Sequence, residues 1–550
     1  MASVMSGLGG LYARLAQEFV RARPLLPTYF HLLLSAIFPI YTAAHASLRR
    51  PISAQSAIKK KSTIQKSTDL EDDDGSVDSD DEDEPASPVE ALSTSDAVLF
   101  PVLAGATLTG LYLIIKWLED PAILNKILGY YFSWMGTFFT FRFLRDALRL
   151  LRNFAYPQYY SSADTLYEAN PQISCFRLSE GTSRSRDDAE DKSAGKTLYW
   201  RLRDYFFDKA ICVVTARKPL TPGRSKLSVD RLDLFAVVLS ATVAVLSLTL
   251  KKVPWYLTNL SGFAFSYGSL QFMSPGSSAT GSLLLSLLFF YDIYMVFYTP
   301  MMVTVATKLD VPIKLLFPRP ADTICPVPDA ALPGSQEMEE YVKCLAKQKT
   351  LAMLGLGDIV VPGILIAFAL RFDLYNYYLK AAKKKTIKQG ENSTTDTTED
   401  SKSVYKPVRG MWAERLFTAK NLWPPTLKAK DFPKPYFKAT VVGYISGMIA
   451  TLFVMQVYQH AQPALLYLVP GVLAGFWGMA LWRGEVALLW QYNEVEEEKE
   501  VDGKSKKEEK TAKETEKDER VFTSSTKKPA ISFDVHLPRR LLRPKIDKSD

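Results

Sequence analysis

The sequence predicts an all-α polytopic membrane protein, a bundle of nine transmembrane helices with disordered loops and a disordered tail. The composition of the 550 residues, 47% hydrophobic and 23% charged with a mean hydropathy of −0.03, would by itself suit a soluble protein of several domains. The apolar and charged residues are, however, separated along the chain into nine apolar stretches of about bilayer-spanning length. A soluble protein seldom carries so many, so nine buried helices of soluble domains are the weaker interpretation.

Each stretch is free of charged residues except for two acids considered below. In order, the stretches are Leu26–Ala44, Ala97–Ile115, Ile127–Phe141, Leu234–Leu250, Trp255–Met273, Gly281–Ala306, Thr350–Leu370, Ala439–Tyr458 and Gln462–Trp482. Between and around them lie the N-terminus 1–25, an acidic segment 58–95, the loops 142–233, 307–349 and 371–438, and the tail 483–550. The acidic segment and the Glu/Lys-rich tail cannot bury enough apolar surface to fold alone, and we expect both to be disordered.

The first stretch has features of a signal peptide. Arginines precede it, and Ala44-His45-Ala46 resembles a cleavage site. Its apolar core is interrupted by His31 and Pro39 and lies late in the chain, which favours a retained membrane span.

The basic residues predict an orientation in the membrane. Most of the 67 Lys and Arg residues fall in the loops 45–96, 142–233 and 371–438 and in the tail, which the nine-span count places on one face. Basic loops stay in the cytosol, so the N-terminus is expected in the lumen and the tail in the cytosol. Arg145, Arg149 and Arg152, close to the third stretch, point the same way. The net charge of +8 therefore indicates orientation on a lipid bilayer rather than a nucleic-acid partner.

Two acids interrupt the apolar stretches, and a charge inside a span marks a functional candidate. Asp292 lies in the sixth stretch and Asp358 in the seventh, which runs in the opposite direction. At about 1.5 Å per helical residue, both carboxyl groups lie roughly 16–18 Å from the cytosolic boundary. The two acids are therefore expected at matching depth.

Two carboxyl groups that share a site cannot both ionise cheaply, so the pair holds one proton. Such a pair can hydrolyse a peptide bond, because the ionised partner takes a proton from water while the protonated partner polarises the scissile carbonyl. Proton-coupled transporters also place acids at the membrane midplane, and depth alone does not separate the two functions.

Small residues flank the second acid. Gly355 and Gly357 precede Asp358, and their missing side chains allow another backbone to approach. An extended substrate held by strand pairing would need that space. A packing face of small residues explains the same glycines. At the start of the ninth stretch, Gln462-Pro463-Ala464-Leu465 taken alone is a helix start.

Three short motifs in fixed order resemble a known family. Tyr291-Asp292, Gly355-Leu356-Gly357-Asp358 and Pro463-Ala464-Leu465, on the sixth, seventh and ninth stretches, resemble the intramembrane GxGD aspartyl proteases. The surrounding sequences PIKLLFP, AMLGLGDIVVPG and HAQPALLYLVPG are similar to the signal peptide peptidase branch rather than to presenilin.

The resemblance implies a fold, an activity and roles for single residues. Asp292 and Asp358 would be the catalytic dyad, and Pro463, Ala464 and Leu465 would shape the active site and bind substrate. Tyr291, Gly355, Leu356 and Gly357 complete the active-site motifs. The fold would be the nine-span presenilin and signal peptide peptidase type, without a cofactor. Substrates would be remnant signal peptides and type II membrane anchors in the endoplasmic reticulum membrane. A homo-oligomer and quality-control partners bound through the cytosolic loops are compatible with this interpretation.

Other functions remain to be compared with this one. A zinc protease is disfavoured because no HExxH motif occurs and the four histidines do not cluster, so no metal site is expected. A proton-coupled transporter and a non-proteolytic scaffold of endoplasmic-reticulum quality control are the remaining alternatives. The chain ends in Asp547-Lys548-Ser549-Asp550 and not in the dilysine signal frequent in the family.

Two glycosylation sequons test the topology. Asn392 is predicted on the cytosolic side and should stay unmodified. Asn259 lies inside the fifth stretch and should be inaccessible.

Overall fold

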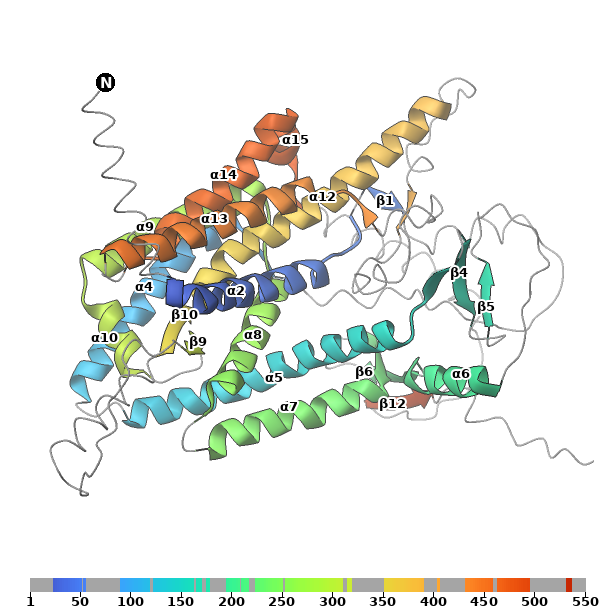
Figure 1. The fold of residues 1–550 in the computed structure, drawn as a ribbon, viewed down its shortest axis with the longest axis horizontal. Helices are drawn as coiled ribbons and strands as arrows, with labels where there is room; N and C mark the ends of the chain where they lie inside the picture. Colours follow the sequence, from blue (N-terminus) through green and yellow to red (C-terminus); the bar gives the residue numbers. More distant parts are fainter. Residues whose placement is uncertain are drawn as a thin grey trace, which may run out of the picture. The chain divides into compact units, whose positions relative to one another are not determined.

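The fold is described from a computed structural model (Figure 1). The structure describes residues 23–51, 53–55, 90–118, 122–162, 165–170, 175–178, 194–207, 209–216, 223–250, 253–309, 314–318, 351–389, 403–405, 431–458, 462–494 and 531–536. The acidic run 69–84, most of the loops 307–349 and 371–438, and Asn392 lie outside these residues.

Helices dominate the described chain, and the larger part of each of the nine apolar stretches lies on a helix. They are α2 (Leu26–Ala46), α4 (Thr94–Trp117), α5 (Ala122–Ala155), α7 (Arg231–Thr249), α8 (Trp255–Phe272), α9 (Ser278–Phe297), α12 (Gly357–Gln389), α13 (Pro435–Tyr458) and α14 (Leu465–Arg483). Within the described residues, six of these helices (α2, α4, α7, α9, α13 and α14) are long and apolar enough to cross a membrane. The protein is therefore a multi-pass membrane protein, and spanning by α5, α8 and α12 stays a prediction.

Two predicted spans differ from single helices. The sixth stretch breaks after Phe297, and a short helix α10 (Met301–Lys308) follows. Pro300 causes the break, because it lacks an N–H and disfavours helical conformation at the preceding residue. The seventh stretch begins as a strand, and its helix starts only at Gly357 and continues past Leu370 to Gln389.

The all-α prediction also needs a correction, because the described loops contain small sheets. Strands β1 (Ala54–Gln55) and β11 (Ser403–Val404) are parallel, as are β2 (Glu90–Leu92) and β8 (Met273–Pro275). Strands β9 (Lys314–Pro318) and β10 (Leu351–Gly355) are antiparallel, as are β3 (Tyr159–Ser162), β4 (Thr165–Asn170) and β5 (Cys175–Leu178) in one sheet. In a further antiparallel sheet, β6 (Lys209–Ala216) lies between β7 (Gly223–Asp230) and β12 (Ile531–His536).

The tail 483–550 was predicted to be disordered throughout, and this prediction is wrong for two segments. A short helix α15 (Val486–Gln491) follows α14, and Ile531–His536 forms β12. The sequence ISFDVH alternates apolar and polar residues, which is the pattern of a half-buried strand.

The chain divides into two compact units. A helical unit comprises residues Met1–Thr140, Ala244–Arg409 and Phe432–Glu497, and a small unit comprises Phe141–Val243, Gly410–Asp431 and Glu498–Asp550.

Helix α12 forms the core of the helical unit. Its residues from Ile364 to Leu370 are fully or almost fully buried, on every side of the helix. A helix that is apolar all round belongs inside a bundle, and α12 contacts α2, α8, α9, α13 and α14 (Figure 1). By contrast, only Ala97 and Ile115 of α4 are buried, as expected of a helix that faces lipid on one side.

Helices α13 and α14 pack backbone against backbone. Gly443 on α13 faces Gly471 on α14, Gly475 on α14 lies against Ala439 on α13, and a Cβ at Gly447 would lie 2.6 Å from the carbonyl oxygen of Tyr467. Small residues four apart permit this approach within membranes.

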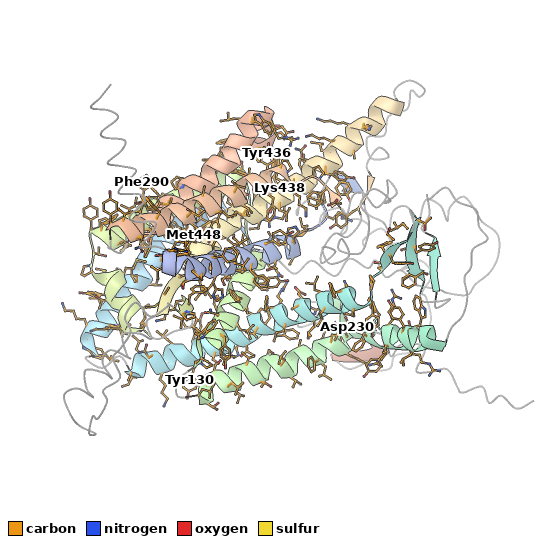
Figure 2. The ribbon with its side chains drawn as sticks, viewed as in Figure 1. Tyr130, Asp230, Phe290, Tyr436, Lys438 and Met448 are labelled. Atoms are coloured by element: carbon orange, nitrogen blue, oxygen red, sulfur yellow. The ribbon has the colours of Figure 1, made fainter. Side chains whose placement is uncertain are left out.

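The start of α13 is attached to α12 by Asp373. Its buried carboxylate accepts hydrogen bonds from the backbone N–H groups of Tyr436 (3.3 Å; labelled in Figure 2) and Phe437 (2.9 Å). These N–H groups have no partner inside their own helix, because they lie in its first turn.

Within the small unit, ion pairs join the C-terminal end of α5 to the start of α7. Arg149 and Arg152 lie 3.2 and 3.4 Å from the buried carboxylate of Asp230 (Figure 2), and Arg145 lies 3.0 Å from Asp233. Burial lowers the pKa of Arg152, and the negative charge of Asp230 partly offsets that effect. Helix α6 (Ala194–Phe207) adds aromatic side chains to this unit. The three arginines that indicated orientation in the sequence are thus ion-paired.

Candidate active site

Asp292 lies in the last third of α9 and is almost completely buried, with 6% of its surface exposed. Ser277 caps this helix by accepting a hydrogen bond from the N–H of Thr280, which sets where α9 begins. One carboxylate oxygen of Asp292, Oδ2, receives no hydrogen bond from the described part of the protein. A buried acceptor without a protein donor is uncommon and indicates a functional position.

Asp358 lies in the first turn of α12, directly after β10. The carbonyl of Leu356 accepts hydrogen bonds from the N–H groups of Ile359 and Val360, which starts the helix. Asp358 is half-buried. Its carboxyl group and that of Asp292 lie close enough for their charges to interact, although the two residues are far apart in the sequence.

The glycines before Asp358 border open space. Gly355 and Gly357 are exposed, and a Cβ at Gly357 would meet no atom of the described chain within 4 Å. A Cβ at Gly355 would lie 3.4 Å from Oδ2 of Asp358. Among the described residues, no other helix packs against these two positions, whereas the glycines of α13 and α14 lie in the contact between those helices.

The motif Pro463-Ala464-Leu465 lies at the start of α14, against the first acid. Pro463 and Leu465 are buried, and α14 begins at Leu465. The backbone N–H of Leu465 donates a hydrogen bond to the Asp292 carboxylate. This N–H lies in the first turn and is available because the helix itself cannot bond it. The third predicted motif thus contacts the first.

The side chain of Tyr291 lies toward another helix, α4. A Cβ on Gly105 of α4 would lie 3.6 Å from the Tyr291 ring, so the ring packs on that helix. Leu356 is buried, and its backbone carbonyl accepts the first hydrogen bonds of α12.

One residue outside the predicted motifs contacts the site. Tyr444 on α13 is 1% exposed, and its hydroxyl donates a hydrogen bond to the backbone carbonyl of Asp358 (3.3 Å). Its neighbour Gly443 belongs to the Gly-x-x-x-Gly spacing of α13, and that spacing is the sequence signal that could have drawn attention to this part of the helix.

Among the described residues, no three His, Cys, Asp or Glu side chains form a group that could hold a metal ion. The site itself consists of two adjacent carboxyl groups, with a helix N-terminus beside one of them.

A comparison with known protein families identifies the family to which the chain belongs. The family model described as signal peptide peptidase matches residues 84–496, which include all three motifs and most of the chain. The chain belongs to the signal peptide peptidase family.

Curated relatives agree with this family membership. The chain is 28% identical to signal peptide peptidase of Mus musculus and 27% identical to that of Homo sapiens, in each case over 74% of both chains. It is 33% identical to intramembrane protease 2 of Caenorhabditis elegans over 51% of this chain and 46% of the relative. No solved structure matches the fold.

The family membership decides between the functions that the sequence left open. The chain is an intramembrane protease of the aspartic class, and the transporter and the scaffold are not favoured.

Proposed function

We propose that Asp292 and Asp358 are the catalytic dyad with which this protease cleaves peptide bonds inside transmembrane helices. The observation that carries the proposal is the interaction of these two carboxyl groups, brought together from α9 and α12. The unbonded Oδ2 of Asp292 and the open space beside Gly357 supply room for water and substrate.

The chemistry follows from a shared proton. The ionised carboxylate removes a proton from a water molecule as its oxygen attacks the scissile carbonyl carbon, and the protonated carboxyl group donates to the carbonyl oxygen. The tetrahedral intermediate collapses when a proton reaches the leaving amide nitrogen and the C–N bond breaks. In this proposal the Leu465 N–H orients Asp292 throughout.

The substrate would bind as a strand along β10. A peptide bond in a helix is shielded by its own hydrogen bonds, so the segment must unwind before water attacks. Strand β10 pairs with β9 alone among the described residues, which leaves its other edge for an added strand. The outer edge of β9 is already bonded, because the Asn259 side chain donates to the Leu316 carbonyl (2.8 Å) and accepts from the Leu316 N–H (2.7 Å).

The proposed substrate class follows the names of the relatives. Two of them are named signal peptide peptidase, which supports remnant signal peptides as substrates, with type II anchors as a further group. We place the protein in the endoplasmic reticulum membrane with nine spans of the presenilin and signal peptide peptidase type, its N-terminus lumenal and its tail cytosolic. Homo-oligomerisation and quality-control partners at the cytosolic loops belong to the same proposal.

Cleavage of a labelled signal peptide by the detergent-solubilised protein tests the dyad. Asp292→Asn and Asp358→Asn should each abolish cleavage, because an amide cannot share the proton. Asp96→Asn, which changes an exposed acid at the start of α4, is the matched control and should cleave normally. Cleavage by either dyad variant would overturn the assignment.

Glycosylation mapping tests the orientation. The natural sequon at Asn392 should remain unmodified in microsomes, and a sequon introduced into the loop 307–349 should be glycosylated. A glycan on Asn392 would reverse the proposed topology.

A further inference from the structure

The first turn of α12 contains a backbone carbonyl that its own helix cannot satisfy. In an α-helix the carbonyl of Asp358 would accept from the N–H of the residue four positions later. That residue is Pro362, which lies inside α12 and has no N–H. The proline ring also crowds the same carbonyl and tilts it away from the helix axis.

Tyr444 supplies the missing donor from the neighbouring helix. Its hydroxyl is 3.3 Å from the Asp358 carbonyl oxygen, and its side chain is buried. A backbone carbonyl whose helical donor is missing needs another donor, and this bond ties the turn that carries the acid to α13.

The position of Tyr444 is itself set by the contact between α13 and α14. Gly443 and Gly447, on either side of it, touch the α14 backbone at Gly471 and Tyr467, which leaves α13 little freedom to slide. The same α14 presents the Leu465 N–H to Asp292. The hairpin of α13 and α14 therefore contacts both acids, one through a hydroxyl and the other through a helix N-terminus.

We propose that Tyr444 is a positioning residue for the intramembrane cleavage reaction, holding Asp358 in place through the carbonyl that Pro362 leaves unpaired. The proposal rests on the dyad proposed above and adds to it a residue that touches no reacting atom. It explains why a helix-breaking residue is tolerated one turn after a catalytic candidate: the tilted carbonyl becomes the attachment point for α13.

A double-mutant cycle tests the proposal. Tyr444→Phe should lower kcat for signal-peptide cleavage by about tenfold and leave KM within about twofold, because small displacements of a reacting group affect turnover more than binding. Pro362→Ala restores the N–H, so in that background Tyr444→Phe should lower kcat by less than about twofold. Tyr458→Phe, on the exposed end of the same helix, is the matched control and should leave kcat unchanged.

The outcomes separate this proposal from others. An equal loss from Tyr444→Phe in both backgrounds would show that the hydroxyl acts independently of Pro362, and unchanged kcat in the single variant would show that it does not act at all. Either result overturns the proposal, whereas cleavage by Asp358→Asn overturns the dyad itself. If Pro362→Ala has no cleavage activity, the Kd of a hydroxyethylene peptide isostere replaces kcat as the quantity measured for all four proteins of the cycle. Binding of this isostere requires the two acids to be correctly positioned but requires no turnover.

Discussion

The guanidinium group of Arg371 and the carboxylate of Glu494 form an ion pair of 2.8 Å between α12 and the segment after α15. Both side chains are buried or nearly so, with 6% and 12% exposed. Arg371 also donates to the hydroxyls of Ser47, after α2, and Ser274, in β8. One arginine near the middle of α12 thus joins four segments.

The first prediction concerns this pair. Glu494→Gln should destabilise the helical unit by about 3–5 kcal/mol, because it leaves a buried arginine without its counter-charge. Thermal inactivation in detergent measures the effect. Arg371→Met combined with Glu494→Leu should recover most of the loss, since an apolar pair carries no desolvation cost. A double variant no more stable than Glu494→Gln would show that the serine hydrogen bonds, rather than the ion pair, stabilise this junction.

The second prediction concerns the contact of α13 with α14. Gly443→Ala should lower both thermal stability and cleavage, because the new Cβ would collide with the Gly471 carbonyl and force the helices apart. Overpacking of this kind costs about 1–3 kcal/mol. Gly478→Ala on α14 is the matched control, since its Cβ would meet no atom within 4 Å. Wild-type cleavage by Gly443→Ala would mean that the helix spacing does not set the site.

The segments that sequence patterns predicted well are those in which local chemistry decides the structure. The lengths of the apolar stretches predicted the positions of the nine long helices. Asp292 and Asp358 were recognisable as the two acids within those stretches, and the structure brings them together. The break at Pro300 and the strand β10 were missed because hydropathy does not distinguish a helix from a strand or a kink.

The contacts that sequence patterns could not predict depend on distant segments. The bond from Tyr444 to Asp358 joins residues of two helices separated by a long loop, and β12 pairs with a strand from the loop 142–233. The local sequence around either partner does not predict which residue it will contact. Asn259 was expected to be inaccessible, and it is 4% exposed, but its bonds to Leu316 followed only from the packing of α8 on β9.

The third prediction concerns that asparagine. Asn259→Ala should loosen the β9–β10 sheet and reduce cleavage, because it leaves the partly buried N–H and C=O of Leu316 without their partner, at a cost of up to about 1–3 kcal/mol each. Ser261→Ala is the matched control: it removes the same glycosylation sequon but leaves the amide in place. Equal cleavage activity of the two variants would show that the β9–β10 sheet does not contribute to substrate binding.

The last prediction concerns the pH dependence of stability at the turn after α14. Glu485 accepts hydrogen bonds from Lys380 (2.7 Å), Asn376 (3.0 Å) and the Tyr436 hydroxyl (3.0 Å), and so joins this turn to α12 and α13. Burial raises the pKa of Glu485, but the bonds from Lys380 and Tyr436 outweigh it and lower the pKa below its ordinary value of 4.5. A carboxyl whose pKa is lower in the folded state stabilises fully at pH values well above 4.5, and its contribution is lost as the pH falls through the folded-state value.

Thermal stability in detergent should therefore fall between pH 6 and pH 3 more steeply for the wild type than for Glu485→Gln, which keeps the side-chain shape but cannot titrate. At pH 7 the variant should be the less stable of the two, because Lys380 loses its ionised partner. Measurement of both proteins across this range checks the sign as well as the size. If the stability of both proteins falls equally steeply between pH 6 and pH 3, the pH dependence belongs to other carboxyl groups. A variant more stable than the wild type at pH 7 would show that the cost of burying the charge of Glu485 exceeds the gain from its three hydrogen bonds.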